Sequence, residues 1–430
     1  MDIKTIEYKN INELMYMYEH KSGLKAFVVP KKGYSKKYAT FATHFGSINN
    51  EFIIPGEAET TKVPDGIAHF LEHKLFEQED GSVMDKFSQL GSSPNAYTGF
   101  GQTVYLFSST DRFDENFKLL LNYVQNPYIT EESVEKEKGI IGQEIKMYED
   151  DPGWRAFFNL LGAFYKNNPV RIDIAGTIES IAEINRDVLY RCYNTFYHPS
   201  NMIILVVGDV DPKEVFQHVE SELKNTQERP EIKRIFPQEQ ESLNKDYAEQ
   251  ALAVSTPLFQ MGFRDNTHNT KGIEALKREV AVKLLLEMIM GRSSGLYNEM
   301  YEEGLINSTF EFDYTIEENY AFSMFGGESV DPLKVRERIS GAIKDIKSKG
   351  LDKDSYERIK RAMTGRFIKQ LNSVERISHT FISVYFRGVN MFDYYEVYDK
   401  ITFEYINDVF SDHFNLNNLA LSVIKPVSAG

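Results

Sequence analysis

The sequence predicts an α+β protein made of two homologous α/β domains, each a mostly antiparallel sheet with helices packed on one face. Three observations support this fold class. Pairs of strand-like runs precede a consecutive run of helical patterns, unlike the strict alternation of a doubly wound fold. The second part of the chain repeats this order. A helix-and-strand sequence at 183–207 also recurs at 404–423, an offset of about 220 residues, which indicates a tandem duplication.

The elements of the first half follow from hydrophobic periodicity. Alternation of apolar and polar residues predicts strands, and a spacing of three to four residues predicts helices. The predicted strands are 24–29, 38–45, 93–98, 103–108 and 202–207. The predicted helices are 65–76, 114–124, 131–150, 153–165, 178–197 and 214–223.

A polar, proline-broken stretch at 225–231 separates this half from the next. We therefore predict a first domain at 1–226, a linker at 227–240 and a second domain at 241–430. The predicted strands of the second domain are 250–256, 307–314, 320–325 and 418–423. Its predicted helices are 271–290, 332–348, 353–370, 374–386 and one beginning near 404.

Composition and charge exclude several classes of protein. Of the 430 residues, 42% are hydrophobic and 26% are charged, so the chain can bury a sizeable core and is not disordered. There are 49 Lys and Arg residues against 64 Asp and Glu residues, a formal net charge of -15. This balance argues against nucleic acid or anionic lipid as the main partner.

The cysteine count and the N-terminus bear on location. The single cysteine, Cys192, excludes an intramolecular disulfide framework, fits a reducing compartment and lies in a helical pattern that favours packing. The first residues show no basic region followed by an apolar run. No uncharged apolar stretch reaches the roughly 18 residues that span a bilayer. We therefore expect a soluble, cytoplasmic protein.

The stretch from Val63 to His73 carries the clearest chemical signal. Its His69-x-x-Glu72-His73 pattern places two imidazoles one helical turn apart on one face, where both reach a single metal ion. Zn2+ readily accepts neutral imidazole nitrogens. Glu72 lies beside them, where a carboxylate can act as a general base. This is the inverted zinc-peptidase order; the alternative is a pair of histidines that holds no ligand.

The same helix has an apolar face. Its members are Ile67, Phe70, Leu71, Lys74 and Leu75, and Lys74 is the polar exception. Asp65 follows a proline and is predicted to cap the N-terminus, so that the helix begins just after it.

A zinc hydrolase needs a third protein ligand and leaves a fourth position for water. The predicted helix at 131–150 offers many carboxylates, and the residues alone single out none of them. The ordinary interpretation of such a run is a solvated helix face. Neighbouring isoleucines place Glu137 and Glu144 near the core, but two helical turns, roughly 10 Å, separate them. The two carboxylates can bracket a site and cannot easily bind one ion together.

These residues resemble the pitrilysin and insulinase family of zinc metallopeptidases. The resemblance rests on His69-x-x-Glu72-His73 followed by Glu144, with Glu137 seven positions before it. It also rests on Asn95-Ala96-Tyr97-Thr98, Thr103-x-Tyr105, Tyr197-His198-Pro199-Ser200-Asn201-Met202 and the duplicated halves. It covers nearly the whole chain. The length fits the short branch that contains the mitochondrial processing peptidases and the YmfH-like bacterial proteins.

The resemblance implies a role for each residue of the zinc motif. His69, His73 and Glu144 would bind one Zn2+ per chain in the first domain, and Glu72 would activate water. Glu137 would lie behind a ligand and steady its orientation and basicity. By the same resemblance, the second domain would lack a metal site.

The resemblance also implies the substrate. The strand with Asn95 and Ala96 would offer its edge to an extended peptide; the alternative is an ordinary hairpin strand. Family members enclose unfolded peptides in a clamshell chamber, and this chain would be half of it. The implied function is a zinc metalloendopeptidase that cleaves unfolded peptides, leader peptides or propeptides inside a dimeric chamber. A catalytically silent structural or binding subunit, or a zinc-stabilised binding module, is the alternative.

The family's second half normally carries an Arg and, seven residues later, a Tyr that follows a Gly-Leu pair. Both reach the opposite active site and stabilise the developing oxyanion. Aligning the pair with Gly304-Leu305 places Met300 at the Arg position and Asn307 at the Tyr position. Met300 has no charge and Asn307 is short, so neither can do this.

A shifted alignment would use Arg292 or Tyr297 instead. Without them, the resemblance implies a heterodimer with a related subunit that lacks the zinc motif and supplies the Arg and Tyr. A homodimer is the alternative. Neither nucleic acid nor a membrane is an expected partner.

Overall fold

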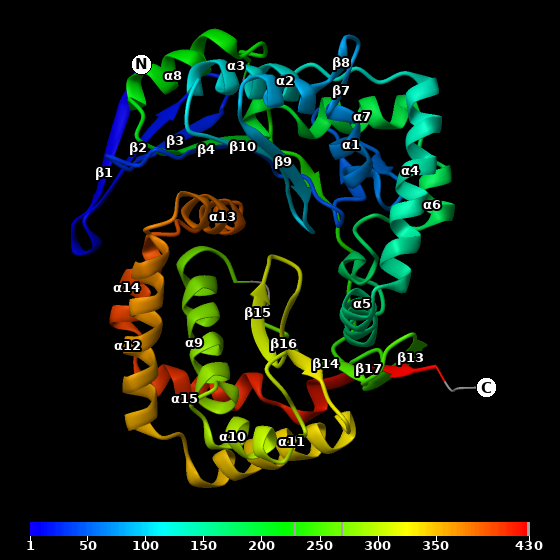
Figure 1. The fold of residues 1–430 in the computed structure, drawn as a ribbon, viewed down its shortest axis with the longest axis vertical. Coiled ribbons are helices and arrows are strands. Elements are labelled where there is room, and N and C mark those ends of the chain that lie inside the picture. The colour runs from blue at the N-terminus through cyan, green and yellow to red at the C-terminus, as the bar shows by residue number, and fades with distance from the viewer. Residues whose placement is uncertain (228, 268–269, 428–430) are drawn as a thin grey trace. The chain divides into compact units, whose positions relative to one another are not determined.

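The computed structural model describes residues 1–227, 229–267 and 270–427, which form two compact units (Figure 1). Unit 1 comprises Met1–Ile145, Ile172–Phe236 and Gln370–Phe386. Unit 2 comprises Lys146–Arg171, Pro237–Lys369 and Arg387–Gly430. Each unit therefore contains a segment from the other half of the chain. The boundary predicted at 227–240 concerns the duplicated halves of the sequence and stays a prediction.

A seven-stranded sheet forms the centre of unit 1. In sheet order the strands are β1 (Ile3–Tyr8), β2 (Glu13–Glu19), β3 (Lys25–Pro30), β11 (Met202–Gly208), β4 (Lys37–Thr43), β10 (Thr103–Ser109) and β9 (Ser93–Thr98). Strands β3 and β11 pair in parallel, and the other neighbours pair antiparallel. Short strands lie outside this sheet: β5 (Glu51–Ile53), β6 (Thr60–Lys62), β7 (Glu77–Gln78), β8 (Gly81–Ser82) and β12 (Lys233–Arg234).

The first-half helices that pack on this sheet lie on one face, as predicted; the sequence did not predict that a helix of the second half covers the other face. One face carries α1 (Ile67–Leu75), α2 (Val83–Gln89), α3 (Phe113–Val124), α7 (Arg186–Phe196) and α8 (Pro212–Glu222) (Figure 1). The helices α4 (Glu131–Asp150) and α6 (Ile178–Ala182) lie beside this layer. From the second half of the chain, α13 (Val374–Tyr385) packs on β4 and β11 from the other face. The single helix predicted at 178–197 is two helices, because the Asn185 side chain caps α7 by accepting the Val188 N–H at 3.0 Å.

The five-stranded sheet of unit 2 repeats part of the unit 1 sheet. Its order is β13 (Tyr247–Leu252), β17 (Leu419–Pro426), β14 (Leu258–Arg264), β16 (Ala321–Glu328) and β15 (Glu311–Ile316). Only the β13 and β17 pair is parallel. The order and directions match β3, β11, β4, β10 and β9 strand for strand. The prediction of two homologous, mostly antiparallel α/β domains is therefore confirmed.

The helices of unit 2 also include one from the other half. Those of the second half are α9 (Gly272–Met290), α10 (Gly295–Glu302), α11 (Pro332–Lys349), α12 (Lys353–Gln370), α14 (Asp393–Lys400) and α15 (Phe403–His413). From the first half, α5 (Pro152–Phe164) packs on β13, β14 and β17. Helices α5 and α13 follow equivalent long helices, α4 and α12. The duplication is thus accompanied by a reciprocal exchange of one helix between the units.

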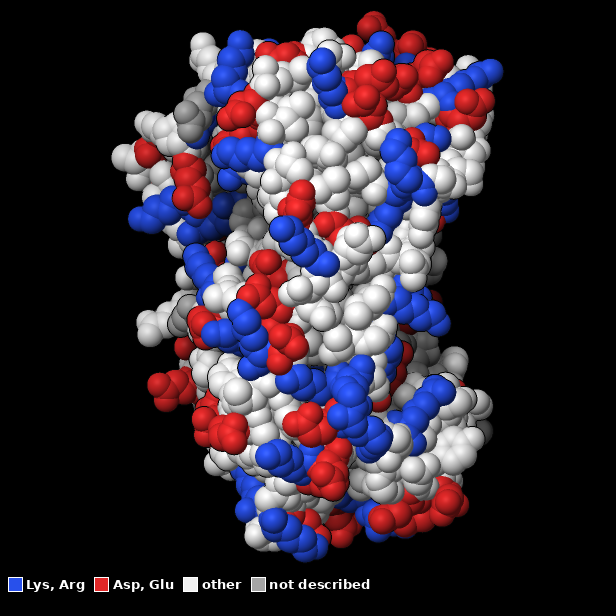
Figure 2. All heavy atoms as spheres, turned by 90° about the vertical axis from the view of Figure 1, so that its left-hand side faces the viewer, with Lys and Arg blue, Asp and Glu red and all other residues white. Residues whose placement is uncertain are grey.

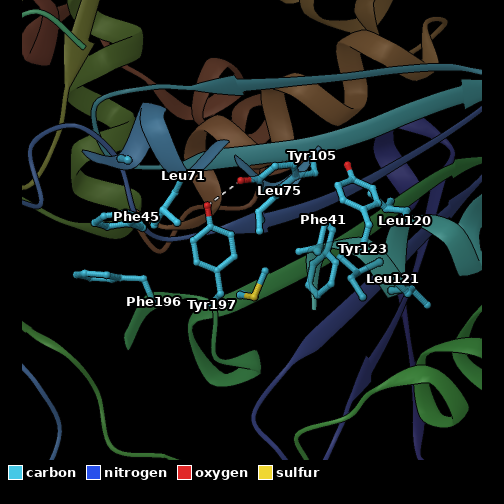
Figure 3. Close-up of a cluster of buried hydrophobic side chains, with 14 of the residues drawn as sticks. Phe41, Phe45, Leu71, Leu75, Tyr105, Leu120, Leu121, Tyr123, Phe196 and Tyr197 are labelled. Atoms are coloured by element: carbon cyan, nitrogen blue, oxygen red, sulfur yellow. Dashed lines mark hydrogen bonds between the residues drawn. The ribbon is translucent and has the colours of Figure 1, made fainter. Parts of the chain in front are cut away.

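The core of unit 1 lies between the sheet and the helix layer that includes α1, α3 and α7 (Figure 3). Leu71 and Leu75 of α1 point into a layer of aromatic rings. The hydroxyls of Tyr105 and Tyr197 bond each other there at 2.8 Å, so their buried oxygens are satisfied. Cys192 is fully buried, and burial raises the pKa of its thiol. The packing interpretation of this cysteine is therefore confirmed.

The core of unit 2 contains a charged network around Asp265, which is 3% exposed. Its carboxylate accepts hydrogen bonds from Arg278 (2.8 and 2.9 Å), from the Tyr314 hydroxyl (2.7 Å) and from His413 Nδ1 (3.1 Å). His413 Nε2 in turn lies 2.8 Å from Ser323 Oγ. Hydroxyl, imidazole and carboxylate follow the order of a hydrolase triad, but all three residues are buried from any substrate. This network is structural.

Two surface properties bear on partners and location. On the face drawn in Figure 2, basic and acidic side chains are interspersed. Within the described residues, no helix combines the length and apolar character that a bilayer crossing requires. The cytoplasmic location stays a prediction.

Candidate metal centre

Helix α1 begins one residue later than the sequence predicted. Its N-cap is Gly66, at φ 87, and not Asp65. A Cβ atom at Gly66 would lie 2.3 Å from the Ala175 carbonyl oxygen, so this close approach in a left-handed conformation requires glycine. Asp65 is occupied elsewhere: its Oδ1 accepts the Asn50 side-chain amide at 2.7 Å. The predicted cap was therefore wrong, although the helix itself is confirmed.

The structure brings His69, His73 and Glu144 together. One donor atom from each lies within 4.8 Å of the other two. His69 Nε2 is 3.6 Å from Glu144 Oε1, and His73 Nε2 is 3.5 Å from Glu144 Oε2. Four-coordinate zinc, with bonds of about 2.0–2.2 Å, holds neighbouring ligand atoms about 3.3–3.6 Å apart. The separations fit two ligands of one tetrahedral ion better than direct hydrogen bonds.

The protonation of His69 also suits a metal ligand. The residue is 9% exposed, and burial, helped by His73, lowers the pKa of its imidazole to about 3. The ring is therefore neutral near pH 7, the form that donates a lone pair. Its Nδ1 is buried without a hydrogen-bond partner among the described residues, which leaves Nε2 directed at Glu144.

Glu137 lies behind His73, outside the three-residue cluster. Its Oε1 accepts a hydrogen bond from His73 Nδ1 at 3.0 Å, which leaves Nε2 to face Glu144. Burial opposes ionisation of Glu137, but the bond to His73 lowers its pKa overall. Burial likewise lowers the pKa of His73, and the bond to Glu137 raises it overall. The arrangement agrees with the expectation that Glu137 and Glu144 do not bind one ion together.

Glu72 lies on the same helix face and is 9% exposed. Its Oε2 accepts a hydrogen bond from the Thr98 hydroxyl at 2.6 Å. Burial raises the pKa of this carboxyl, and the bond from Thr98 partly opposes the shift. A raised pKa strengthens a general base. Sequence analysis gave Thr98 no role. The signal that could have indicated one was its place in the strand, since alternate residues of β9 face α1.

Strand β9 presents the free edge of the sheet beside this cluster. At the hairpin end the Gly99 N–H donates to the Gln102 carbonyl at 2.8 Å. Because bonded pairs alternate along an antiparallel ladder, the backbone groups of Ala96 and Thr98 then face outward. The Ala96 N–H donates to Asn95 Oδ1 at 2.9 Å. Asn95 is exposed.

In the second half, the resemblance aligns Met300 and Asn307 with the positions of the family's Arg and Tyr. Met300 is fully buried in α10, and Asn307 donates to Glu328 at 2.7 Å. Tyr297 is buried and stacks on Tyr301. Arg292 is exposed. Within the described part of the chain, only His69, His73 and Glu144 form a converging group of three or more metal-ligand side chains.

Comparison with known proteins matches both halves. Residues 52–178 match the family model described as Insulinase (Peptidase family M16), and residues 183–363 match Peptidase M16 inactive domain. The chain is 43% identical to the uncharacterized zinc protease YmfH of Bacillus subtilis, across 99% of this chain and 100% of that protein. It is 27% identical to the uncharacterized zinc protease YmxG of the same organism, across 74% of this chain and 77% of that protein.

Solved structures of related proteins have the same fold as this chain. A crystal structure of an M16-like peptidase from Alicyclobacillus acidocaldarius superposes with a TM-score of 0.92 at 32% identity, covering 99% of both chains. A protease from Helicobacter pylori gives a TM-score of 0.78 at 18% identity, covering 99% of this chain and 100% of that one. The second likeness concerns the fold alone. The expected YmfH-like resemblance is confirmed.

Proposed function

Because the chain belongs to the insulinase family, peptidase family M16, we propose that it is a zinc-dependent endopeptidase and that unit 1 holds its active site. One observation carries the proposal: His69, His73 and Glu144 converge within 4.8 Å, with the buried carboxylate of Glu72 on the same helix face. Relatives named zinc proteases support the choice of metal.

The proposed chemistry divides between the metal and the protein. A Zn2+ ion held by His69, His73 and Glu144 supplies Lewis acidity toward water and the peptide carbonyl. Glu72 accepts a proton from the attacking water and later delivers it to the leaving amine. Thr98 holds the Glu72 carboxylate at 2.6 Å, so that the base is fixed before substrate arrives. Glu137 fixes the orientation of the His73 ring.

We propose that the substrate is an unfolded peptide, a leader peptide or a propeptide that adds to β9 as a strand. The outward backbone groups of Ala96 and Thr98 would pair with it, after the Ala96 N–H leaves Asn95 Oδ1. Main-chain pairing requires an extended segment, so a folded domain is a poor substrate. The dimeric chamber remains part of this proposal.

The partner is proposed to be a related subunit that lacks the zinc motif and supplies an Arg and Tyr pair. The buried positions of Met300 and Tyr297 support this, because neither side chain is available to reach a substrate from α10. A second copy of this chain would lack the same pair. The heterodimer is therefore preferred over the homodimer.

We expect the isolated chain to hydrolyse an unstructured fluorogenic peptide weakly or not at all. Adding a related subunit that carries the Arg and Tyr should restore hydrolysis, because these groups stabilise the oxyanion. The measurement is the initial rate at increasing subunit concentration. The same peptide sequence inside a rigid folded domain should remain uncut.

Two controls make this experiment decisive. A partner subunit with its Arg and Tyr replaced should bind without restoring the rate. Full activity of the isolated chain, undiminished by Arg292→Ala and Tyr297→Phe, would contradict the heterodimer. Efficient cutting of the folded domain would contradict the proposed substrate class.

A further inference from the structure

Lys74 lies on the core-facing side of α1, next to the metal-ligand residue His73, and its side chain is fully buried. Lysine is seldom fully buried, because an ammonium taken out of water needs anionic partners and hydrogen-bond acceptors. Lys74 has three such neighbours. Its Nζ contacts the Glu77 carboxylate, the Ser133 carbonyl oxygen at 3.4 Å and Glu137 Oε2 at 3.8 Å.

The contact with Glu137 links Lys74 to the metal cluster. One oxygen of the Glu137 carboxylate accepts the His73 Nδ1 hydrogen bond at 3.0 Å, and the other faces the ammonium. The carboxylate is therefore held from both sides. Its side chain is only 11% exposed, so little water competes for either oxygen.

The contact with Ser133 links Lys74 to the position of a whole helix. Ser133 lies in the first turn of α4, and the same helix carries Glu144 three turns later. Lys74 thus connects the C-terminal end of α1, which carries the two histidines, to the N-terminal end of α4, which carries the third ligand. The distance between these helices decides whether Glu144 reaches the histidines.

We propose that Lys74 is a positioning residue of the metal centre. Its ammonium holds Glu137 in the orientation that fixes the His73 ring, and it holds α1 against α4 so that Glu144 meets both histidines. The inference deepens the proposed function, on which it rests, because it takes Zn2+ to be the occupant of the cluster.

A purely electrostatic effect of Lys74 would have the opposite sign. A positive charge near a cation site repels the cation, so removing that charge alone would tighten zinc binding. Removing a positioning contact weakens zinc binding, because the ligands lose their arrangement before the metal arrives. The sign of the change in affinity separates these two effects.

The test is the zinc affinity of the metal-free, full-length chain, measured by competition with a chromophoric chelator. Lys74→Met keeps the length of the side chain and removes its charge and donors. We expect zinc affinity to fall by about 10- to 100-fold, the range for loss of an outer-shell partner. Glu137→Gln should give a similar loss. The double variant should lose less affinity than the two single losses combined, because both changes disturb the Glu137 carboxylate that holds the His73 ring.

Glu77→Gln is the matched control, because it removes the other anionic partner of Lys74 and leaves the contact with Glu137. Its zinc affinity should stay at the parent value. Unchanged or tighter binding by Lys74→Met would overturn the inference. If that variant fails to fold, Lys74→Gln replaces it: weaker binding than the parent supports positioning, and equal or tighter binding overturns it. A parent chain that binds no zinc would instead contradict the proposed function.

Discussion

Replacing Glu72 by Gln is expected to lower peptide hydrolysis by about 10²- to 10⁴-fold, the usual contribution of a general acid–base residue. The amide keeps the size of the carboxylate and can still accept the Thr98 hydrogen bond, but it cannot take a proton from water. Zinc content should stay near the parent value, because Glu72 is not one of the three converging ligands. The measurements are kcat with the activating subunit present and zinc per chain by mass spectrometry.

Glu135→Gln on the exposed face of α4 is the control for this variant. It removes a carboxylate that pairs with Lys138 and touches none of the ligands, so both rate and zinc content should remain unchanged. Hydrolysis by Glu72→Gln at the parent rate would show that the assigned base is wrong. If the chain is a catalytically silent subunit, the parent and both variants will show no hydrolysis. If it is a zinc-stabilised binding module, all three will hold zinc and none will hydrolyse the peptide.

Replacing Asp265 by Asn is expected to lower the free energy of unfolding of unit 2 by about 3–5 kcal/mol, the cost of breaking a buried ion pair from one side. The change removes the buried carboxylate partner of the Arg278 guanidinium, which is 8% exposed, and leaves it the more exposed Asp412. Unfolding in urea can be followed through Trp154, the chain's single tryptophan, which belongs to unit 2.

The same carboxylate gives a pH dependence. Burial opposes its ionisation, but the bonds from His413 and Arg278 hold the pKa of Asp265 well below its ordinary value. Its stabilisation is therefore complete above the unfolded pKa of about 3.9 and is lost as the pH falls toward the folded pKa. The parent should lose stability on acidification below about pH 4 more steeply than Asp265→Asn.

Asp412→Asn is the matched control, because Asp412 pairs with the same guanidinium at 2.7 Å from a side chain that is 55% exposed. An exposed pair contributes about 0–1 kcal/mol, so this variant should stay close to the parent. Equal unfolding of the two variants would show that the buried network does not stabilise unit 2.

Sequence periodicity predicted most elements of both halves, because the apolar residues of an amphipathic helix or an alternating strand recur with the period of its buried face. It could not predict which sheet a helix covers. Helices α5 and α13 each have an apolar face, but nothing in that face distinguishes the two equivalent sheets. Strand β14 was missed, although it lies in the middle of its sheet. Position 262 requires glycine, because a Cβ atom there would lie 1.9 Å from the Ser323 carbonyl oxygen. A glycine has no apolar side chain, so it interrupts the apolar pattern that predicts a strand.

The strand positions in the second half were less accurate than those in the first. The strand predicted at 307–314 is β15 at Glu311–Ile316, and the strand predicted at 250–256 is β13 at Tyr247–Leu252. Both lie at the edges of their sheet, where one-sided burial makes the period weak. Strands β1 and β2 at the far end of the unit 1 sheet were also missed; most of their residues are half-buried or exposed, which makes the apolar period weak.

The sequence pattern alone predicted only part of the candidate site. The spacing of His69, Glu72 and His73 predicted a shared helix face, since three- and four-residue steps align on a helix. Glu144 came from the family resemblance, because a run of carboxylates along α4 does not show which one faces α1. The contacts of Lys74 with Glu137 and of Thr98 with Glu72 cross between elements, and no local pattern records them.

The central claim is that His69, His73 and Glu144 together form a zinc site. The most direct test is zinc per chain after dialysis, for the parent protein and for variants His69→Ala, His73→Ala and Glu144→Ala, with Glu149→Ala as a control on the same helix. The account predicts about one zinc in the parent and in the control, and loss of zinc in each of the three ligand variants. Zinc retained in all three variants, or a parent that binds none, would contradict it.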